Sequence, residues 1–151
     1  GNAVWTLEDP FENLKNLAPY ALTTSLRDTM MWPTENGFGG QWTAMGDGLV
    51  DWKQYFEHFT RVCPKTPVCI ENISGFNFEL KTKQENYWKN WPKGKPKDYQ
   101  KFMAFAKRGK MRAAWKAPEG VDRKKAQQGY QRNDLEKSIG YCQKLGLGLN
   151  H

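Results

Sequence analysis

The stretch Met45-Gly-Asp-Gly-Leu-Val-Asp-Trp52, followed by Pro67-Val-Cys-Ile-Glu71, indicates the fold more clearly than any other part of the chain. It predicts a glycine-rich loop and then a helix capped by Asp51, because aspartate is a favoured N-cap residue. The apolar run Val68–Ile70 predicts a short buried strand that ends at the carboxylate of Glu71. A buried strand with an acid at its carboxyl end is how a β/α barrel presents a catalytic or metal-binding residue.

The residues before this stretch continue the alternation of helix and strand. Asp9-Pro10 predicts a helix start, since aspartate suits the N-cap and proline the first helical position. Residues 20–26 are rich in β-branched and apolar side chains and predict a strand. Residues 29–50 contain 5 glycines and predict a long loop. The order of elements therefore predicts an α/β fold with parallel strands at 20–26 and 68–71.

Charge divides the chain into two parts. Residues 1–77 carry 5 basic and 9 acidic side chains, a net charge of −4, whereas residues 78–151 carry 18 and 7, a net charge of +11. We therefore expect a first domain over 1–77 and a basic helical extension over 78–151. Within the extension, Asp98 and Asp122 predict the starts of two helices. The basic surface is typical of a solvated helical face, and the alternative is a polyanion-binding module.

Length and termini set further expectations. A complete (β/α)8 barrel needs roughly 200 to 250 residues, and this chain has 151. It opens Gly1-Asn2-Ala3-Val4-Trp5, without a methionine, so we expect it to begin inside a longer protein. The apolar runs are too short to cross a membrane. The 3 cysteines lack zinc-site spacing, and free thiols favour a cytoplasmic location over export.

Several local motifs resemble the C-terminal part of the xylose isomerase-like superfamily, the sugar phosphate isomerases and epimerases. Gly1-Asn2 resembles the segment Asp-x-Gly-Asn, Leu26-Arg27-Asp28 the end of His-x-His-Leu-Lys-Asp, and Gly46–Trp52 the loop Gly-x-Gly-x-Val-Asp-Trp. Val68–Glu71 is similar to the last barrel strand, and Ser138–Leu149 to the tails of some environmental bacterial members. The matches cover about half of the chain.

The resemblance implies a definite fold. The chain would be a C-terminal fragment of a (β/α)8 TIM barrel, with the last two strands and their helices, followed by the helical extension. The rest of the barrel, or another copy in a homo-oligomer, would then be its partner. We expect this chain alone to be inactive, because most of the family's ligands would lie in the missing strands.

The resemblance also implies metal-assisted proton transfer on a carbohydrate or sugar phosphate. A divalent metal, Mn²⁺, Mg²⁺, Co²⁺ or Zn²⁺, would be held in the parent protein, although this chain need not bind one. Glu71 would be both a catalytic residue and a metal ligand. Arg27, Asn2 and Trp32 would bind the substrate. Nucleic acid and membrane are not expected partners.

The sequence departs from the family pattern where the family has histidines. Thr23 and Ser25 stand at those positions, and a hydroxyl binds a divalent metal more weakly than an imidazole. This departure leaves open a second hypothesis, a relative that binds a sugar without catalysis.

Each candidate residue also has a structural interpretation. Glu71 could pair with a nearby lysine or arginine, and Arg27 with Asp28 or Glu8. Trp32 could pack the long loop instead of lining a sugar site, as could Trp42. For Asp28 we favour capping of the loop through its carboxylate.

Overall fold

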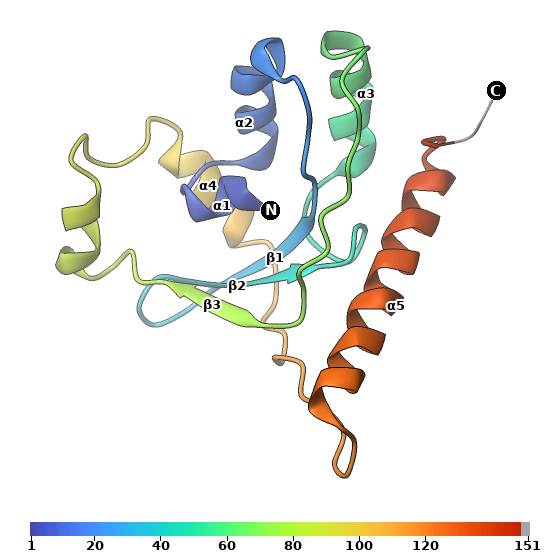
Figure 1. Cartoon of the computed structure of the whole chain (residues 1–151). Helices are drawn as coiled ribbons and strands as arrows, with labels where there is room; N and C mark the ends of the chain where they lie inside the picture. The colour runs from blue at the N-terminus through green and yellow to red at the C-terminus, as the bar shows by residue number, and fades with distance from the viewer. Residues whose placement is uncertain (149–151) are drawn as a thin grey trace.

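The computed structural model describes residues 1–148, whose elements surround a three-stranded antiparallel sheet in the order β1-β2-β3 (Figure 1). The strands are β1 (Asp28–Pro33), β2 (Phe38–Thr43) and β3 (Asn77–Leu80). The helices are α1 (Asn2–Trp5), α2 (Pro10–Leu17), α3 (Trp52–Val62), α4 (Tyr99–Ala106) and α5 (Arg123–Lys144), and the 3-10 helices are η1 (Ala18–Tyr20) and η2 (Glu85–Asn90).

Two apolar clusters hold the molecule together. The first lies on one face of the sheet, where Met31 and Phe38 pack with Val4 and Phe102 from the α1 and α4 regions. The second joins α2, α3 and the end of α5, and its buried members are Leu14, Ala18, Met45, Trp52, Phe56, Phe59, Cys63 and Cys142. Burial of large aromatic and aliphatic side chains in both clusters is the main stabilising term of the fold.

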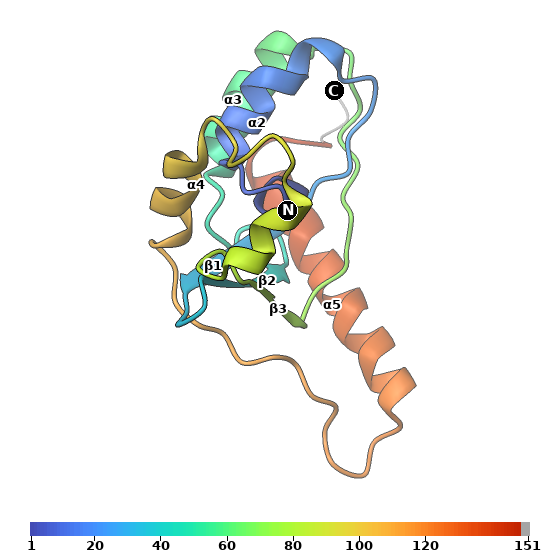
Figure 2. The ribbon, with the colours of Figure 1, turned by 90° about the vertical axis from the view of Figure 1, so that its left-hand side faces the viewer.

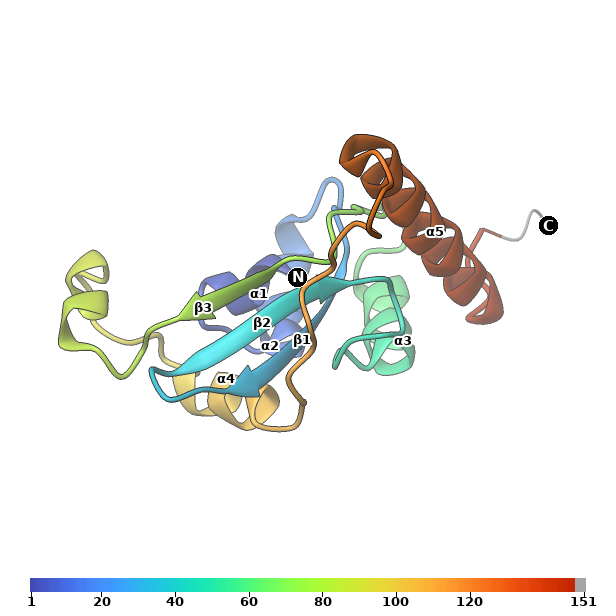
Figure 3. The same ribbon diagram turned by 90° about the horizontal axis from the view of Figure 1, so that it is seen from below.

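The opposite face of the sheet is covered by the extended segment between α4 and α5. Viewed from below, this segment crosses the strands, and from the side it hangs beneath the sheet before α5 begins (Figures 2 and 3). Gln41 donates a hydrogen bond to the carbonyl of Ala113 at 3.0 Å, and Asn77 donates to the carbonyl of Arg112 at 2.8 Å. The sheet is therefore covered by helices on one side and by a single extended segment on the other.

The prediction of a barrel fragment with two parallel strands is wrong. The sheet is antiparallel, and the segments 20–26 and 68–71 are joined by one parallel bridge, between Leu26 and Ile70. The hydroxyl of Thr24 takes the place of backbone pairing, since it donates to the carbonyl of Pro67 at 2.9 Å and accepts from the amide of Cys69 at 3.0 Å. Pro67 also lacks an N–H to extend a ladder.

The predicted loop over 29–50 contains most of the sheet instead. Residues 28–43 form the hairpin β1–β2, and its glycines lie directly opposite bulky side chains, Gly39 opposite Trp32 and Gly40 opposite Met31. A Cβ on Gly39 would overlap the Trp32 ring. These glycines therefore make room for rings from neighbouring strands, a role that composition alone does not distinguish from loop flexibility.

The predicted helices are confirmed in outline. Asp9, Asp51 and Asp122 accept hydrogen bonds from amides in the first turns of α2, α3 and α5, whereas Asp98 makes no such bond before α4. The boundary expected between residues 77 and 78 falls inside β3, so the acidic and basic parts of the chain share one sheet.

Two further observations bear on the sequence analysis. Cys63, Cys69 and Cys142 are free thiols, as expected. Among residues 1–148, no helix is both long enough and apolar enough to span a bilayer. Leu149, the last residue of the tail resemblance, lies outside the described residues.

Candidate functional site

Three of the four predicted site residues meet at one place, although they are far apart in the sequence. Arg27 Nη1 lies 3.0 Å from Glu71 Oε1, and Arg27 Nη2 donates a hydrogen bond to the Asn2 side-chain oxygen. Ser25 donates from its hydroxyl to the second carboxylate oxygen of Glu71 at 3.2 Å. We call Asn2, Ser25, Arg27, Trp42 and Glu71 the Glu71 cluster.

Backbone bonds bring these residues together. The amide of Glu71 donates to the carbonyl of Leu26 at 2.8 Å, and the amide of Leu26 donates to the carbonyl of Cys69 at 2.8 Å. The nitrogen of Gly1 donates to the carbonyl of Arg27 at 2.7 Å, which positions Asn2 next to the guanidinium. The single parallel bridge is thus what holds Glu71 against Arg27.

Arg27 is nearly enclosed, with 5% of its side chain exposed, whereas 28% of the Glu71 side chain is exposed. The guanidinium carbon lies 3.7 Å from the centre of the Trp42 ring, a cation–π contact. Burial lowers the pKa of Arg27, and the charge of Glu71 opposes this shift. Because the ordinary pKa of arginine lies far above neutral pH, Arg27 stays charged here and serves as the counter-ion of Glu71.

An aromatic surface adjoins the charged pair. The Trp42 ring centre lies 5.6 Å from that of Trp5 and 5.1 Å from that of Phe76. Trp5 is 48% exposed and Phe76 is 44% exposed, so both rings face solvent. The buried N–H groups Arg27 Nε and Trp42 Nε1 have no hydrogen-bond partner among the described residues. The cluster therefore combines a held carboxylate with unpaired donors, and the exposed rings of Trp5 and Phe76 lie beside it.

Trp32, the fourth predicted residue, lies elsewhere. Side chains alternate between the two faces of a strand, so Arg27 and Trp32, five positions apart, point to opposite faces. Trp42 faces the same side as Thr29, its register partner, and as the core residue Met31, two positions along β1. Trp32 is 5% exposed and packs over Gly39. The odd spacing between Arg27 and Trp32 is a sequence signal against Trp32, whereas the position of Trp42 follows from the register of the hairpin, which pairs it with Thr29.

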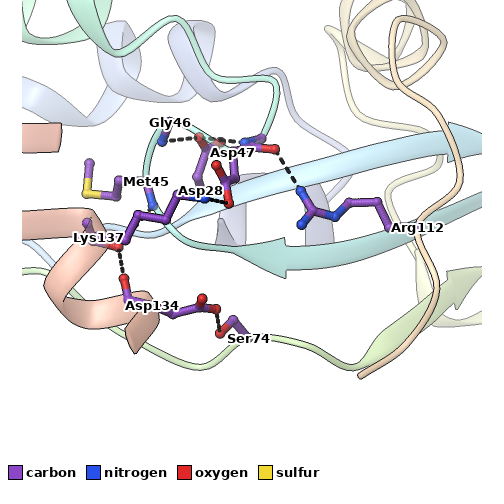
Figure 4. A network of polar contacts seen from close by, with 10 residues as sticks. Asp28, Met45, Gly46, Asp47, Ser74, Arg112, Asp134 and Lys137 are labelled. Atoms are coloured by element: carbon purple, nitrogen blue, oxygen red, sulfur yellow. Dashed lines mark hydrogen bonds and ion pairs between the residues drawn. The ribbon is translucent and has the colours of Figure 1, made fainter. Parts of the chain in front are cut away.

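The next residue, Asp28, points away from the cluster and organises the loop behind it. Its carboxylate accepts hydrogen bonds from the amides of Thr29, Gly46, Gly48 and Val50, at 2.7, 3.0, 3.1 and 3.3 Å. Figure 4 shows Asp28 beside this loop. Burial raises the pKa of Asp28, and the side chain of Trp52 with the amides of Thr29, Val50 and Gly48 partly opposes the shift. The predicted loop-capping role of Asp28 is confirmed.

Two glycines of the same loop are required for different reasons. Gly46 has a φ of +89°, and a Cβ there would strike the ring of Tyr141 on α5. Gly48 does not have a positive φ, but a Cβ there would overlap the carboxylate of Asp28. The motif Gly-Asp-Gly thus reflects one left-handed turn and one close approach.

The residues of the Glu71 cluster do not fit a divalent metal. Within residues 1–148, no group of three or more histidine, cysteine, aspartate or glutamate side chains could hold a metal ion. Glu71 is the one carboxylate of the cluster, and the positive charge of Arg27 lies against its Oε1. A cation at that oxygen would be repelled by the guanidinium, so we derive no step through a metal at these residues.

Comparison of the chain with protein-family models, with characterised proteins and with solved structures gave no significant match. The resemblance to the xylose isomerase-like superfamily is therefore neither supported nor contradicted by relatives.

Proposed function

We propose that the Glu71 cluster binds a carbohydrate or sugar phosphate, as part of a sugar isomerase- or epimerase-like protein. The observation that supports this function is the meeting of Asn2, Arg27 and Glu71 in space, since their separation in the sequence gives no local reason for contact. Sugars present both hydroxyl groups and apolar C–H faces, and the cluster offers polar groups beside exposed rings.

Each residue has a distinct part in this proposal. The rings of Trp5 and Phe76 would stack against the C–H face of a sugar. The side-chain oxygen of Asn2 accepts from Arg27, which leaves its NH2 group free to donate to a hydroxyl. Arg27 is too enclosed to meet a substrate directly and acts by pairing with Glu71 and holding it in place. Glu71 is then the group that would accept a proton from the bound sugar.

Titration of the isotope-labelled chain with glucose and glucose 6-phosphate, followed by nuclear magnetic resonance, tests the proposal. We expect saturable shifts of the indole signals of Trp5 and Trp42. Replacing the exposed ring in Trp5→Ala should weaken binding about tenfold, or ~1.4 kcal/mol. Tyr20→Ala is the matched control, because Tyr20 is 80% exposed and is not among the rings that contact Trp42. Equal behaviour of the two variants, or no shifts at either indole, would rule out a sugar site here.

A second candidate function is sugar binding without catalysis. Two observations favour it. The cluster fits a metal poorly, and the hydroxyl of Ser25 donates a hydrogen bond to the carboxylate of Glu71. Incubation of a bound sugar in deuterated water distinguishes the two, since proton abstraction next to the carbonyl exchanges that hydrogen for deuterium. Exchange that disappears in Glu71→Gln indicates acid–base chemistry. Sugar binding without exchange indicates the non-catalytic function.

A further inference from the structure

A second candidate site lies on the basic half of the chain, far in sequence from Glu71. A cavity of about 610 Å³ opens between η2 and α4, next to the end of the β1–β2 hairpin. We call it the lysine groove, and its cationic and aromatic lining residues are Phe38, Lys83, Trp88, Lys95, Tyr99 and Lys107. Its volume falls within the range of roughly 300 to 1,000 Å³ that is usual for small-molecule sites.

The lysines of the groove lack acidic partners. Among the described residues, none of Lys83, Lys95 and Lys107 has a carboxylate within 4.0 Å. By contrast, Lys101, which lies on α4 like the groove residue Tyr99, has acidic partners: Glu12 at 3.0 Å and Asp98 at 3.4 Å. One acid, Glu85, lines the groove. Three positive charges and one negative charge around this cavity leave a net charge of +2, which favours an anion.

Two of these cations are held in place. Lys83 Nζ donates to the carbonyls of Thr34 and Glu35, at 3.2 and 3.0 Å, which fixes it at the hairpin end. Lys95 Nζ lies 4.9 Å from the centre of the Trp88 ring and 5.6 Å from that of Tyr99. Ordering these long side chains in advance lowers the entropy that a ligand would otherwise have to overcome.

The wall of the groove is aromatic and also fixed. Trp88 donates from its indole N–H to the carbonyl of Thr82 at 2.9 Å, and its ring packs edge-on against Tyr99 with centres 5.5 Å apart. Tyr99 in turn stacks on the fully buried Phe102. A rigid aromatic wall beside positive charge is the combination by which proteins bind the base and the phosphate of a nucleotide together.

We propose that the lysine groove binds a nucleotide, with its phosphate among Lys83, Lys95 and Lys107 and its base against Trp88. The ligand is either a free nucleotide or the end of a single strand, because both present the same base and phosphate. The proposal is independent of the sugar function proposed for the Glu71 cluster, because the two sites have no residue in common.

The test is a titration of the whole chain with adenosine diphosphate, inorganic pyrophosphate and a single-stranded deoxythymidine 12-mer at low salt. The readout is the indole signal of Trp88, identified by its loss in Trp88→Phe. We expect saturable shifts with the diphosphate nucleotide. The triple variant Lys83→Gln, Lys95→Gln and Lys107→Gln should lose at least about tenfold in affinity, because it removes all three charges. Lys107→Gln alone should show part of this loss, and it disturbs no hydrogen bond or ion pair of the fold.

The matched control is the triple variant Lys53→Gln, Lys65→Gln and Lys144→Gln, which removes three exposed charges elsewhere. Its affinity should change by less than about twofold. Equal losses in the two triple variants would overturn the proposal, since binding would then follow overall charge. Pyrophosphate that binds as tightly as the nucleotide would also overturn it, because the base would contribute nothing. Tighter binding of the 12-mer identifies a strand as the ligand, and equal binding identifies a free nucleotide.

Discussion

At the scale of single residues, two neighbours in the chain take opposite roles. Arg27 and Asp28 are adjacent, and the alternation of an extended chain directs them to opposite faces of the sheet. Arg27 pairs with Glu71 at the candidate site, whereas Asp28, fully buried, accepts bonds from the loop that follows the hairpin. Neither of the ion pairs considered for Arg27 from the sequence, with Asp28 or with Glu8, forms.

Replacement of Asp28 by asparagine should lower the free energy of unfolding by about 3 kcal/mol. The reason is that each carboxylate oxygen accepts two amides, and an NH2 group in place of one oxygen would face two N–H donors. Urea unfolding measures the change. Asp51→Asn is the matched control, because Asp51 caps α3 through one amide and asparagine is an equally good N-cap. Similar stability of Asp28→Asn and wild type would contradict the proposed loop-capping role.

At the scale of elements, the sequence predicts helices better than strands. Helices α2, α3 and α5 have capping side chains and local hydrogen bonds, so the nearby residues specify them. The hairpin β1–β2 depends instead on pairing across the sheet and on a third strand, β3, from beyond residue 70. By composition its glycines predict a loop, because the rings that cover them belong to other strands.

Helix α5 is attached to the body by a small set of polar contacts. Ser74 donates to the carboxylate of Asp134, and Lys137 pairs with Asp47 at 2.6 Å (Figure 4). Ser138 donates to the carbonyl of Asp134 at 2.7 Å and accepts from the amide of Met45 at 3.0 Å. These bonds fix α5 against the loop that Asp28 organises, so the loop and the helix depend on one another.

Ser138→Ala should therefore cost about 1 to 3 kcal/mol, since it leaves the buried amide of Met45 without an acceptor. Hydrogen exchange should show faster exchange at that amide, and urea unfolding should show the loss of stability. Asn133→Ala, an exposed change on the same helix, should be neutral or slightly stabilising because alanine is the better helix former. If Ser138→Ala leaves the Met45 amide as protected as before, the contact does not hold α5.

At the scale of the whole molecule, the acidic and basic parts of the chain form one structure. Strand β3 joins them in a single sheet, and α5 contributes Cys142 to the cluster that α2 and α3 form. The charge difference between the parts is therefore a property of the surface and does not separate two folding units.

The thiols report on opening of this structure. Cys69 is exposed, whereas Cys63 and Cys142 are buried in the second apolar cluster. Burial also raises the pKa of Cys142, which lowers its reactive thiolate fraction. We expect a thiol reagent to modify Cys69 quickly and the other two only as the chain unfolds. Cys69→Ser should abolish the fast phase. Fast reaction of Cys142 in that variant would show that α5 detaches while the rest stays folded.

Part of the candidate site follows from the resemblance, which implies Asn2, Arg27 and Glu71, and these three residues do come together. The sequence does not place Trp42, Trp5 and Phe76 beside them, because their proximity depends on the register of the hairpin and on the position of α1. The sequence shows the lysines of the groove as part of the basic half of the chain. Their positions around one cavity depend on the fold.

The sequence by itself determined what acts over a few residues, namely the caps of α2, α3 and α5. It also determined the charge of each half. The tertiary structure alone decided the antiparallel sheet, the pairing of Arg27 with Glu71 and the packing of α5 on the Met45 loop. The physical reason is the distance along the chain between the residues that interact. Caps form between neighbours, whereas strand pairing and buried ion pairs join residues that come within reach after the whole chain has packed.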